Sequence, residues 1–134
     1  MLSLKYIIDD KKLDCETENI RKRIYKKKLN QTDYLLVEEK YLESEMKTLE
    51  KKEIILDDKN ISEMKKILSG DKNEIQLYNI KPYSKNLGKK VYLLKNNDEF
   101  LLIKDDYIYT KRYSPKYITK KDLISLTEEN IKKL

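Results

Sequence analysis

The stretch KVYLLK-NND-EFLLIK, residues 90–104, gives the most direct indication of the fold. Its apolar residues follow a period of two on either side of Asn96-Asn97-Asp98, which is the pattern of half-buried strands. Asn and Asp tolerate the backbone angles of a tight turn. We therefore expect two antiparallel strands joined at this turn.

The same period of two extends outward from this stretch. It predicts four strands in the C-terminal half, with a second tight turn at Asp105-Asp106 and a loop over residues 81–89. Ser114-Pro115 then ends the last strand, and Thr119, with Asp122 three residues on, indicates the start of a C-terminal helix. The expected strands are 74–80, 90–95, 99–104 and 107–112.

The N-terminal half shows mainly helical spacing after a short alternating strand at residues 2–8. Apolar residues spaced by three and four predict a helix over 14–29, and the cap-forming run Asn30 to Asp33 predicts a second helix reaching about Lys52. A short extended piece follows, and then a short helix that Gly70 ends. The residues carrying this reading are Leu13, Thr17, Ile20, Ile24, Leu35, Leu42, Met46, Leu49 and Asn60.

These elements predict an α+β fold, in which N-terminal helices pack on a C-terminal antiparallel meander of three to four strands and a C-terminal helix closes the structure. With 134 residues the chain has the usual size of one domain. We expect a single domain over 1–134, with a mainly helical half at 1–70 and the meander and last helix at 71–134. No internal repeat is evident.

Composition restricts the chemistry. The chain has no histidine, which excludes histidine-based triads and the common zinc-peptidase helix, and two glycines, Gly70 and Gly88, which exclude the glycine-rich nucleotide loops. One cysteine, Cys15, allows no internal disulfide. We expect no enzyme activity, no cofactor and no metal site.

A metal-dependent carboxylate nuclease is the remaining enzymatic hypothesis, and we rank it third. Its Glu-x-Lys spacing occurs at Glu38/Lys40, Glu45/Lys47 and Glu63/Lys65. All three pairs fall on expected helices, where residues two apart diverge by about 200°. That divergence would keep the two side chains from one metal-bound phosphate.

A basic run lies near the N-terminus and has two interpretations. A helix bearing these cations could lie along a phosphate backbone. Alternatively it is a solvated surface, partly neutralised by the acidic segment 33–52, where Glu38 and Glu45 fall inside the apolar arc of the expected helix. The cations are Arg21, Lys22, Arg23, Lys26, Lys27 and Lys28.

A second group of tyrosines and cations follows the meander. On a strand, two rings beside a cation could stack single-stranded bases. The alternative is that these rings form the ordinary core face of an edge strand. The residues are Tyr107, Tyr109, Lys111, Arg112, Tyr113 and Lys116.

The net charge of +6 combines a basic N-terminus, an acidic middle and a basic C-terminal part. With no catalytic motif, this indicates a non-enzymatic protein that engages a protein or nucleoprotein complex. The AT-biased composition and small size resemble those of phage or mobile-element proteins, including inhibitors of host defence nucleases. The alternative is a nucleic-acid-binding regulator of RNA or DNA that uses segment 20–29 and the strand at 107–117.

We expect no membrane segment and no small-molecule substrate. No apolar run approaches the roughly 20 residues of a membrane helix, and the first ten residues lack the features of a signal peptide. The expected location is the cytoplasm, which would be the host cytoplasm for a phage protein.

Overall fold

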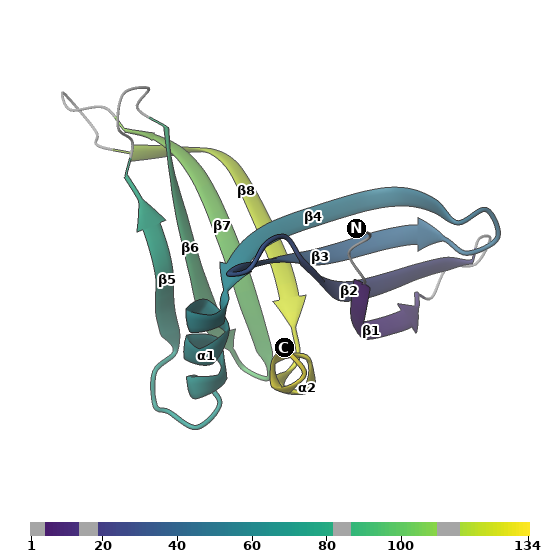
Figure 1. Cartoon of the computed structure of the whole chain (residues 1–134), viewed down its shortest axis with the longest axis horizontal. Coiled ribbons are helices and arrows are strands. Elements are labelled where there is room, and N and C mark those ends of the chain that lie inside the picture. The colour runs from purple at the N-terminus through teal and green to yellow at the C-terminus, as the bar shows by residue number, and fades with distance from the viewer. Residues whose placement is uncertain (1–4, 14–18, 82–86, 110–115) are drawn as a thin grey trace. The chain divides into compact units, whose positions relative to one another are not determined.

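The computed structural model describes residues 5–13, 19–81, 87–109 and 116–134 (Figure 1). They form two four-stranded antiparallel sheets, and in each sheet the strands lie in chain order. The protein is therefore mostly β, and the expected α+β fold, with a helical N-terminal half, is wrong. The first sheet contains β1 (Lys5–Lys12), β2 (Ile20–Lys28), β3 (Asp33–Leu42) and β4 (Lys47–Asp57). The second contains β5 (Glu74–Ile80), β6 (Leu87–Asn96), β7 (Glu99–Tyr109) and β8 (Lys116–Leu126).

Two short helices complete the described elements. Helix α1 (Asp58–Lys66) confirms the short helix expected before Gly70, and α2 (Glu128–Lys132) follows β8. Within the described residues, neither helix is long and apolar enough to cross a membrane.

The chain forms two compact units, Met1–Asp58 with Lys133–Leu134, and Lys59–Lys132. Each unit has a buried apolar core, most of which comes from side chains at alternate positions of its strands. In the first unit the core includes Ile24, Leu36, Ile54 and Leu56, and in the second it includes Val91, Leu93, Leu102, Ile124 and Leu126.

Helices were expected over 14–29 and from 30 to about 52. Residues 14–18 lie outside the described residues, and the rest of these segments forms β2, β3 and the first part of β4. Ile20 and Ile24 are four residues apart, a spacing that places two side chains on one side of a strand as well as of a helix. In β3 both faces are covered, since Leu36 and Val37 are adjacent and both are buried. A strand buried on both sides shows no alternation, so its period could not be read from the sequence.

The run from Asn30 to Asp33, expected to cap a helix, instead turns the chain between β2 and β3. Asn30 Oδ1 accepts hydrogen bonds from the backbone N–H groups of Thr32 and Asp33, at 2.9 and 2.8 Å. Asn stabilises turns and helix starts by the same side-chain-to-backbone bond. The expected side-chain-to-backbone hydrogen bonds of Asn30 are therefore present, but they stabilise a turn between two strands and not the start of a helix.

Two expectations for the C-terminal half are also wrong. Asp105 and Asp106 do not form a turn but lie inside β7, and residues 117–126 form a strand rather than a helix. The C-terminal helix starts only at Glu128. Thr127 caps it, because Thr127 Oγ1 accepts a bond from the Asn130 backbone N–H at 3.1 Å and Asn130 Oδ1 accepts one from the Thr127 N–H. The turn expected at Asn96-Asn97-Asp98 is confirmed, with Asn97 at a φ of 57°.

The two halves of the chain are a structural repeat, although no repeat was evident beforehand. Each half has four meandering strands followed by a helix, and the irregularities recur in order. The register slips between Ile7 and Asp9 in β1, and again between Gln76 and Tyr78 in β5. The register between β3 and β4 also slips, next to Tyr41, and the register between β7 and β8 slips at the equivalent place, next to Tyr107.

Aligning these irregularities reveals a sequence correspondence. Asp33–Leu42 reads DYLLVEEKYL, and the corresponding part of β7 reads EFLLIKDDYI. Each helix starts with an acidic residue and carries a buried Asn-Ile pair, Asn60-Ile61 in α1 and Asn130-Ile131 in α2. The tyrosines beside the bulges also match, since Tyr41 donates to the Asp10 carboxylate at 2.9 Å and Tyr107 donates to Asn79 Oδ1 at 2.7 Å.

Candidate nucleic-acid interface

The basic run forms β2, an inner strand of the first sheet. Because side chains alternate along a strand, the run divides between the two faces of the sheet. Lys22, Lys26 and Lys28 share the face of the core residue Ile24. Arg21, Arg23 and Lys27 share the other face, with Tyr25.

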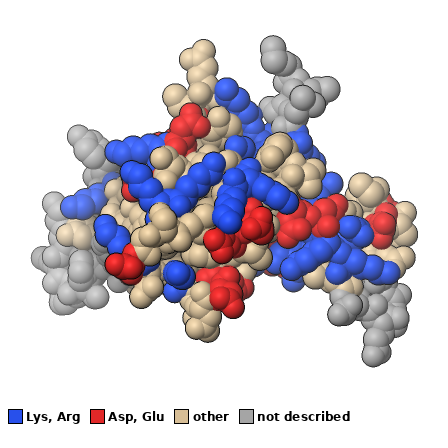
Figure 2. Space-filling model, turned by 90° about the horizontal axis from the view of Figure 1, so that it is seen from below, with Lys and Arg blue, Asp and Glu red and all other residues tan. Residues whose placement is uncertain are grey.

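The first three cations of the run form ion pairs with carboxylates of neighbouring strands. Arg21 Nε lies 3.0 Å from Asp10 Oδ1, Lys22 Nζ lies 3.5 Å from Glu38 Oε2, and an Arg23 nitrogen lies 2.5 Å from Glu39 Oε1. Glu38 also lies 3.8 Å from Lys52 of β4. Figure 2 shows the same mixing on one face of the molecule, where basic side chains lie directly beside acidic ones.

Glu38 and Glu39 are both buried, so these pairs are part of the sheet's internal structure. Thr48 Oγ1 also donates to Glu39, at 2.5 Å. Burial acts to raise the pKa of Glu39, but the hydrogen bonds from Thr48 and Arg23 outweigh it and lower the pKa. Glu45, which we grouped with Glu38, is exposed in the turn after β3.

Arg23 also contacts two aromatic rings. Its guanidinium carbon lies 5.5 Å from the centre of the Tyr25 ring and 4.7 Å from that of Tyr41. Such cation–π contacts fix the guanidinium plane. Arg23 is therefore held within the sheet by an ion pair with Glu39 and by cation–π contacts with two tyrosine rings.

The last three cations of the run have different surroundings. Lys26 Nζ lies 5.7 Å from the centre of the Tyr6 ring and 4.8 Å from that of Tyr34. Across the part of the chain that the structure describes, no ion pair involves Lys5, Lys27 or Lys28. We name the residues at this end of the three strands the Lys26 cluster. Its members Tyr6, Lys26, Lys28 and Tyr34 lie on one face of the sheet, and Lys5 and Lys27 lie on the other.

The strand register brings the cluster together. Tyr6 lies opposite Lys26, Lys5 lies opposite Lys27, and Lys28 lies opposite Tyr34. The Tyr6 side chain is 53% exposed. The nearby carboxylate of Asp58 raises the pKa of the Tyr34 phenol.

Sequence reasoning identified Lys26, Lys27 and Lys28 but missed Lys5, Tyr6 and Tyr34. These three lie on β1 and β3, and their proximity depends on a register that a helix at 14–29 would not produce. The alternation of Leu4, Tyr6 and Ile8 did indicate a strand at the N-terminus, but not its partner.

The second predicted group is only partly described. Lys111, Arg112 and Tyr113 lie outside the described residues, as does the side chain of Lys116, while Tyr109 is half-buried at the end of β7. Tyr107 is 3% exposed, and its hydroxyl donates to Asn79 Oδ1 at 2.7 Å and to the Ile80 carbonyl at 3.2 Å. Burial leaves little of the Tyr107 ring surface for a base to stack on.

Two of the three Glu-x-Lys pairs do not lie on helices as expected. Glu38/Lys40 lies on β3 with both side chains on one face, and Glu45/Lys47 lies at the turn after β3 and the start of β4, whereas Glu63/Lys65 lies on α1. Glu38 contacts Lys22 and Lys52, and Lys40 lies 3.5 Å from Glu50. No group of three or more potential metal ligands occurs among the described residues.

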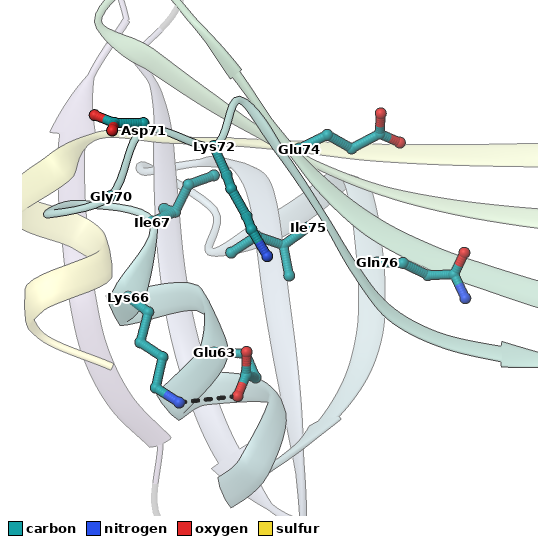
Figure 3. A pocket seen from close by; sticks show the side chains of 9 residues that line it. All are labelled: Glu63, Lys66, Ile67, Gly70, Asp71, Lys72, Glu74, Ile75 and Gln76. Carbon is teal, nitrogen blue, oxygen red and sulfur yellow. Dashed lines mark hydrogen bonds and ion pairs between the residues drawn. The ribbon is translucent and has the colours of Figure 1, made fainter.

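A pocket of about 640 Å³ lies in the second unit beside the end of α1 and the start of β5 (Figure 3). Ile67 and Ile75 contribute its apolar surface. Its polar wall mixes both signs, and Lys66 there lies 3.1 Å from Glu63. The remaining lining residues are Gly70, Asp71, Lys72, Glu74 and Gln76.

Comparison with known proteins adds no relative: no family model matches the chain, and no curated protein matches it.

Proposed function

We propose that this protein is a non-enzymatic nucleic-acid-binding protein and that the Lys26 cluster is its contact surface. One observation carries the proposal. Of the six cations on β2, Arg21, Lys22 and Arg23 are ion-paired within the sheet, whereas Lys27 and Lys28 form no ion pair among the described residues, and Lys28 lies on the same face of the sheet as the exposed ring of Tyr6.

Phosphate binding requires cations whose charge is not already neutralised. Each lysine that neutralises a phosphate releases a counterion, and this release drives the association and makes it salt-dependent. Lys27 and Lys28 fulfil this condition. Lys28 shares its face of the sheet with Tyr6, whose ring adds an aromatic surface for bases or sugars, whereas Lys27 lies on the other face beside Lys5.

The test is a binding titration of the full chain against fluorescently labelled oligonucleotides at several salt concentrations. The variant Lys27→Glu with Lys28→Glu is expected to weaken binding at least about tenfold and to reduce the salt slope by about 1.4, the share of two phosphates on a single strand. The matched control is Lys59→Glu with Lys65→Glu, which makes the same charge change at exposed positions of α1.

The control variant is expected to bind like the unmodified protein apart from a small general charge effect. An unchanged titration for the Lys27/Lys28 variant would remove the proposal. Equal losses in both variants would show that net charge alone is responsible, and would also contradict it.

A second candidate function is contact with a protein or nucleoprotein complex, including inhibition of a host defence nuclease. The observation that favours it is a set of exposed apolar side chains in the second unit. Leu87 is 59% exposed and Tyr117 is 55% exposed, and both lie in register with Ile108 of β7. Exposed apolar residues gathered in this way are typical of contact surfaces.

This candidate predicts a stoichiometric protein partner that stays bound at high salt and is lost on substituting Leu87→Ser with Tyr117→Ser. Recovery of salt-labile, nonspecific proteins alone would reject it.

A further inference from the structure

The repeat provides an internal comparison for the Lys26 cluster. Tyr6 lies opposite Lys26 across β1 and β2, and Ile75 lies opposite Leu93 across β5 and β6. Lys26 in turn lies opposite Leu36, and Leu93 lies opposite Leu102. The register therefore matches Lys26 with Leu93 and Tyr6 with Ile75.

The same alignment matches Tyr34 with Phe100, because these residues occupy the second position of the corresponding segments of β3 and β7. Leu93 is fully buried and Phe100 is 4% exposed. Both are ordinary core residues of the second sheet. At the equivalent positions the first sheet carries a lysine and a half-buried tyrosine.

This difference has a physical cost. Burying a leucine stabilises a fold, whereas a lysine at the same position must keep its ammonium group solvated or paired. In the second half of the chain these positions carry buried apolar residues. A polar residue at the equivalent position of the first half is the kind of local exception that is expected at functional sites. The lysine and the tyrosine lie beside Tyr6 and Lys28, in the corner formed by β1, β2 and β3.

We infer that the Lys26 cluster binds single-stranded nucleic acid, that a base stacks on Tyr6, and that each chain holds one such site, in the first unit. The inference rests on the proposed function and specifies its substrate. A ring that is 53% exposed beside a cation offers a stacking surface for an unpaired base. In a duplex the faces of the bases are already stacked on one another, so a surface ring cannot reach them without unstacking the helix.

The experiment uses the full chain with a labelled oligothymidylate of about ten nucleotides, and with a duplex of the same length. The unmodified protein is expected to bind the single strand at least about tenfold more tightly than the duplex, at one strand per chain. Tyr6→Ala is expected to lose about tenfold to hundredfold in affinity for the single strand. Tyr6→Phe is expected to retain the affinity, because it keeps the ring.

The control is Met46→Ala, which removes an exposed side chain (67% exposed) from the turn between β3 and β4 of the same unit and is expected to bind normally. A further variant, Lys26→Leu, gives the first sheet the residue of the second. It is expected to weaken binding while leaving the melting temperature unchanged or higher, a readout that does not depend on binding.

Several results would overturn the inference. Equal affinity for single strand and duplex, with Tyr6→Ala unaffected, would leave a phosphate-binding surface and hence the proposed function, but would reject stacking. Two strands per chain would reject the single site. A lower melting temperature for Lys26→Leu would make Lys26 structural. Absence of binding to either oligonucleotide would reject the inference together with the proposed function.

Discussion

The Tyr92 hydroxyl in β6 donates a hydrogen bond to Asp105 Oδ2 in β7, at 3.1 Å. Asp105 is buried, and its Oδ1 has no hydrogen-bond partner among the residues that the structure describes. In the second unit, therefore, the buried carboxylate of Asp105 accepts its side-chain hydrogen bond from the neutral phenol of Tyr92. Glu39, at the equivalent position of the first unit, is instead bound by Arg23 and Thr48.

This relationship predicts a loss of stability at alkaline pH. Burial, reinforced by the hydrogen bond to Asp105, raises the pKa of Tyr92 from 10.0 to about 12. The unfolded chain releases this proton near pH 10 while the folded chain retains it, so the contribution is complete below pH 10 and is lost as the pH rises towards 12. Urea unfolding at a series of pH values should show a smaller loss over this interval for Tyr92→Phe.

Burial also raises the pKa of Tyr25, Tyr41 and Tyr107, so the substitution should reduce the alkaline loss rather than abolish it. If Tyr92→Phe and the unmodified protein lose the same free energy of unfolding between pH 10 and 12, the assignment to Tyr92 is wrong.

Gly88 is predicted to be intolerant of a side chain. A Cβ at this position would lie 2.5 Å from Tyr107 Cζ and 2.7 Å from the Ile80 carbonyl oxygen. Gly88→Ala should therefore reduce the free energy of unfolding by about 1–3 kcal/mol, the usual cost of overpacking. Gly70→Ala is the control, since its Cβ would meet its nearest atom at 3.4 Å, and it should stay within about 0.5 kcal/mol. Similar values for both variants, measured by denaturant unfolding, would contradict this packing.

Arg23 is predicted to be required for the stability of the first unit. Replacing it with methionine leaves the buried Glu39 carboxylate without its cation, and breaking such a pair costs about 3–5 kcal/mol. The double variant Arg23→Met with Glu39→Leu should recover most of this loss, because no buried charge then remains. Lys27→Met, on the same face of β2, should change the stability little. A double variant no more stable than Arg23→Met would argue against the buried pair.

The repeat predicts that one cross-strand pair can be reversed in sign. Glu38 and Lys52 join β3 to β4 at 3.8 Å, and at the equivalent place Lys104 and Asp122 join β7 to β8 at 3.6 Å with the charges exchanged. Lys104→Glu alone places two carboxylates opposite each other and should cost about 1 kcal/mol. Adding Asp122→Lys should restore stability.

Lys120, which also lies 3.7 Å from Asp122, is exposed and can turn into solvent in that double variant. A double variant less stable than the single one, measured by thermal unfolding, would show that the two places are not interchangeable.

The sequence predicted the elements that its local signals define without ambiguity. The turn at Asn96-Asn97-Asp98 and the strand at 74–80 are present because turn chemistry and alternation agreed there. The helix before Gly70 is present too, but it begins at Asp58, so Asn60 lies inside it and not at its cap. The first sheet was missed because Ile20 and Ile24 suit a helix and a strand equally, and because cations cover both faces of β2. Asn30 bonds the backbone as a capping residue would, but in a turn.

The candidate site was predictable in part. A run of cations is visible in any sequence, so Lys26, Lys27 and Lys28 could be identified. Which cations are neutralised depends on cross-strand partners such as Glu38 and Glu39, and the same register brings Tyr6 to Lys26. The repeat was hidden because its two halves agree in bulges and burial more than in residue identity.

The last residues of the described chain bear on how the protein is made. Lys133 and Leu134 belong to the first unit, and Lys133 Nζ lies 3.5 Å from the carbonyl oxygen of Ile8, a partner 125 positions earlier. On the ribosome, the first sheet can pair its strands long before this contact becomes available. Leu134, buried in the finished protein, reaches its place after the whole second sheet has been synthesised. The first unit to be translated is thus the last to be completed, and its final stability is acquired after synthesis of the second.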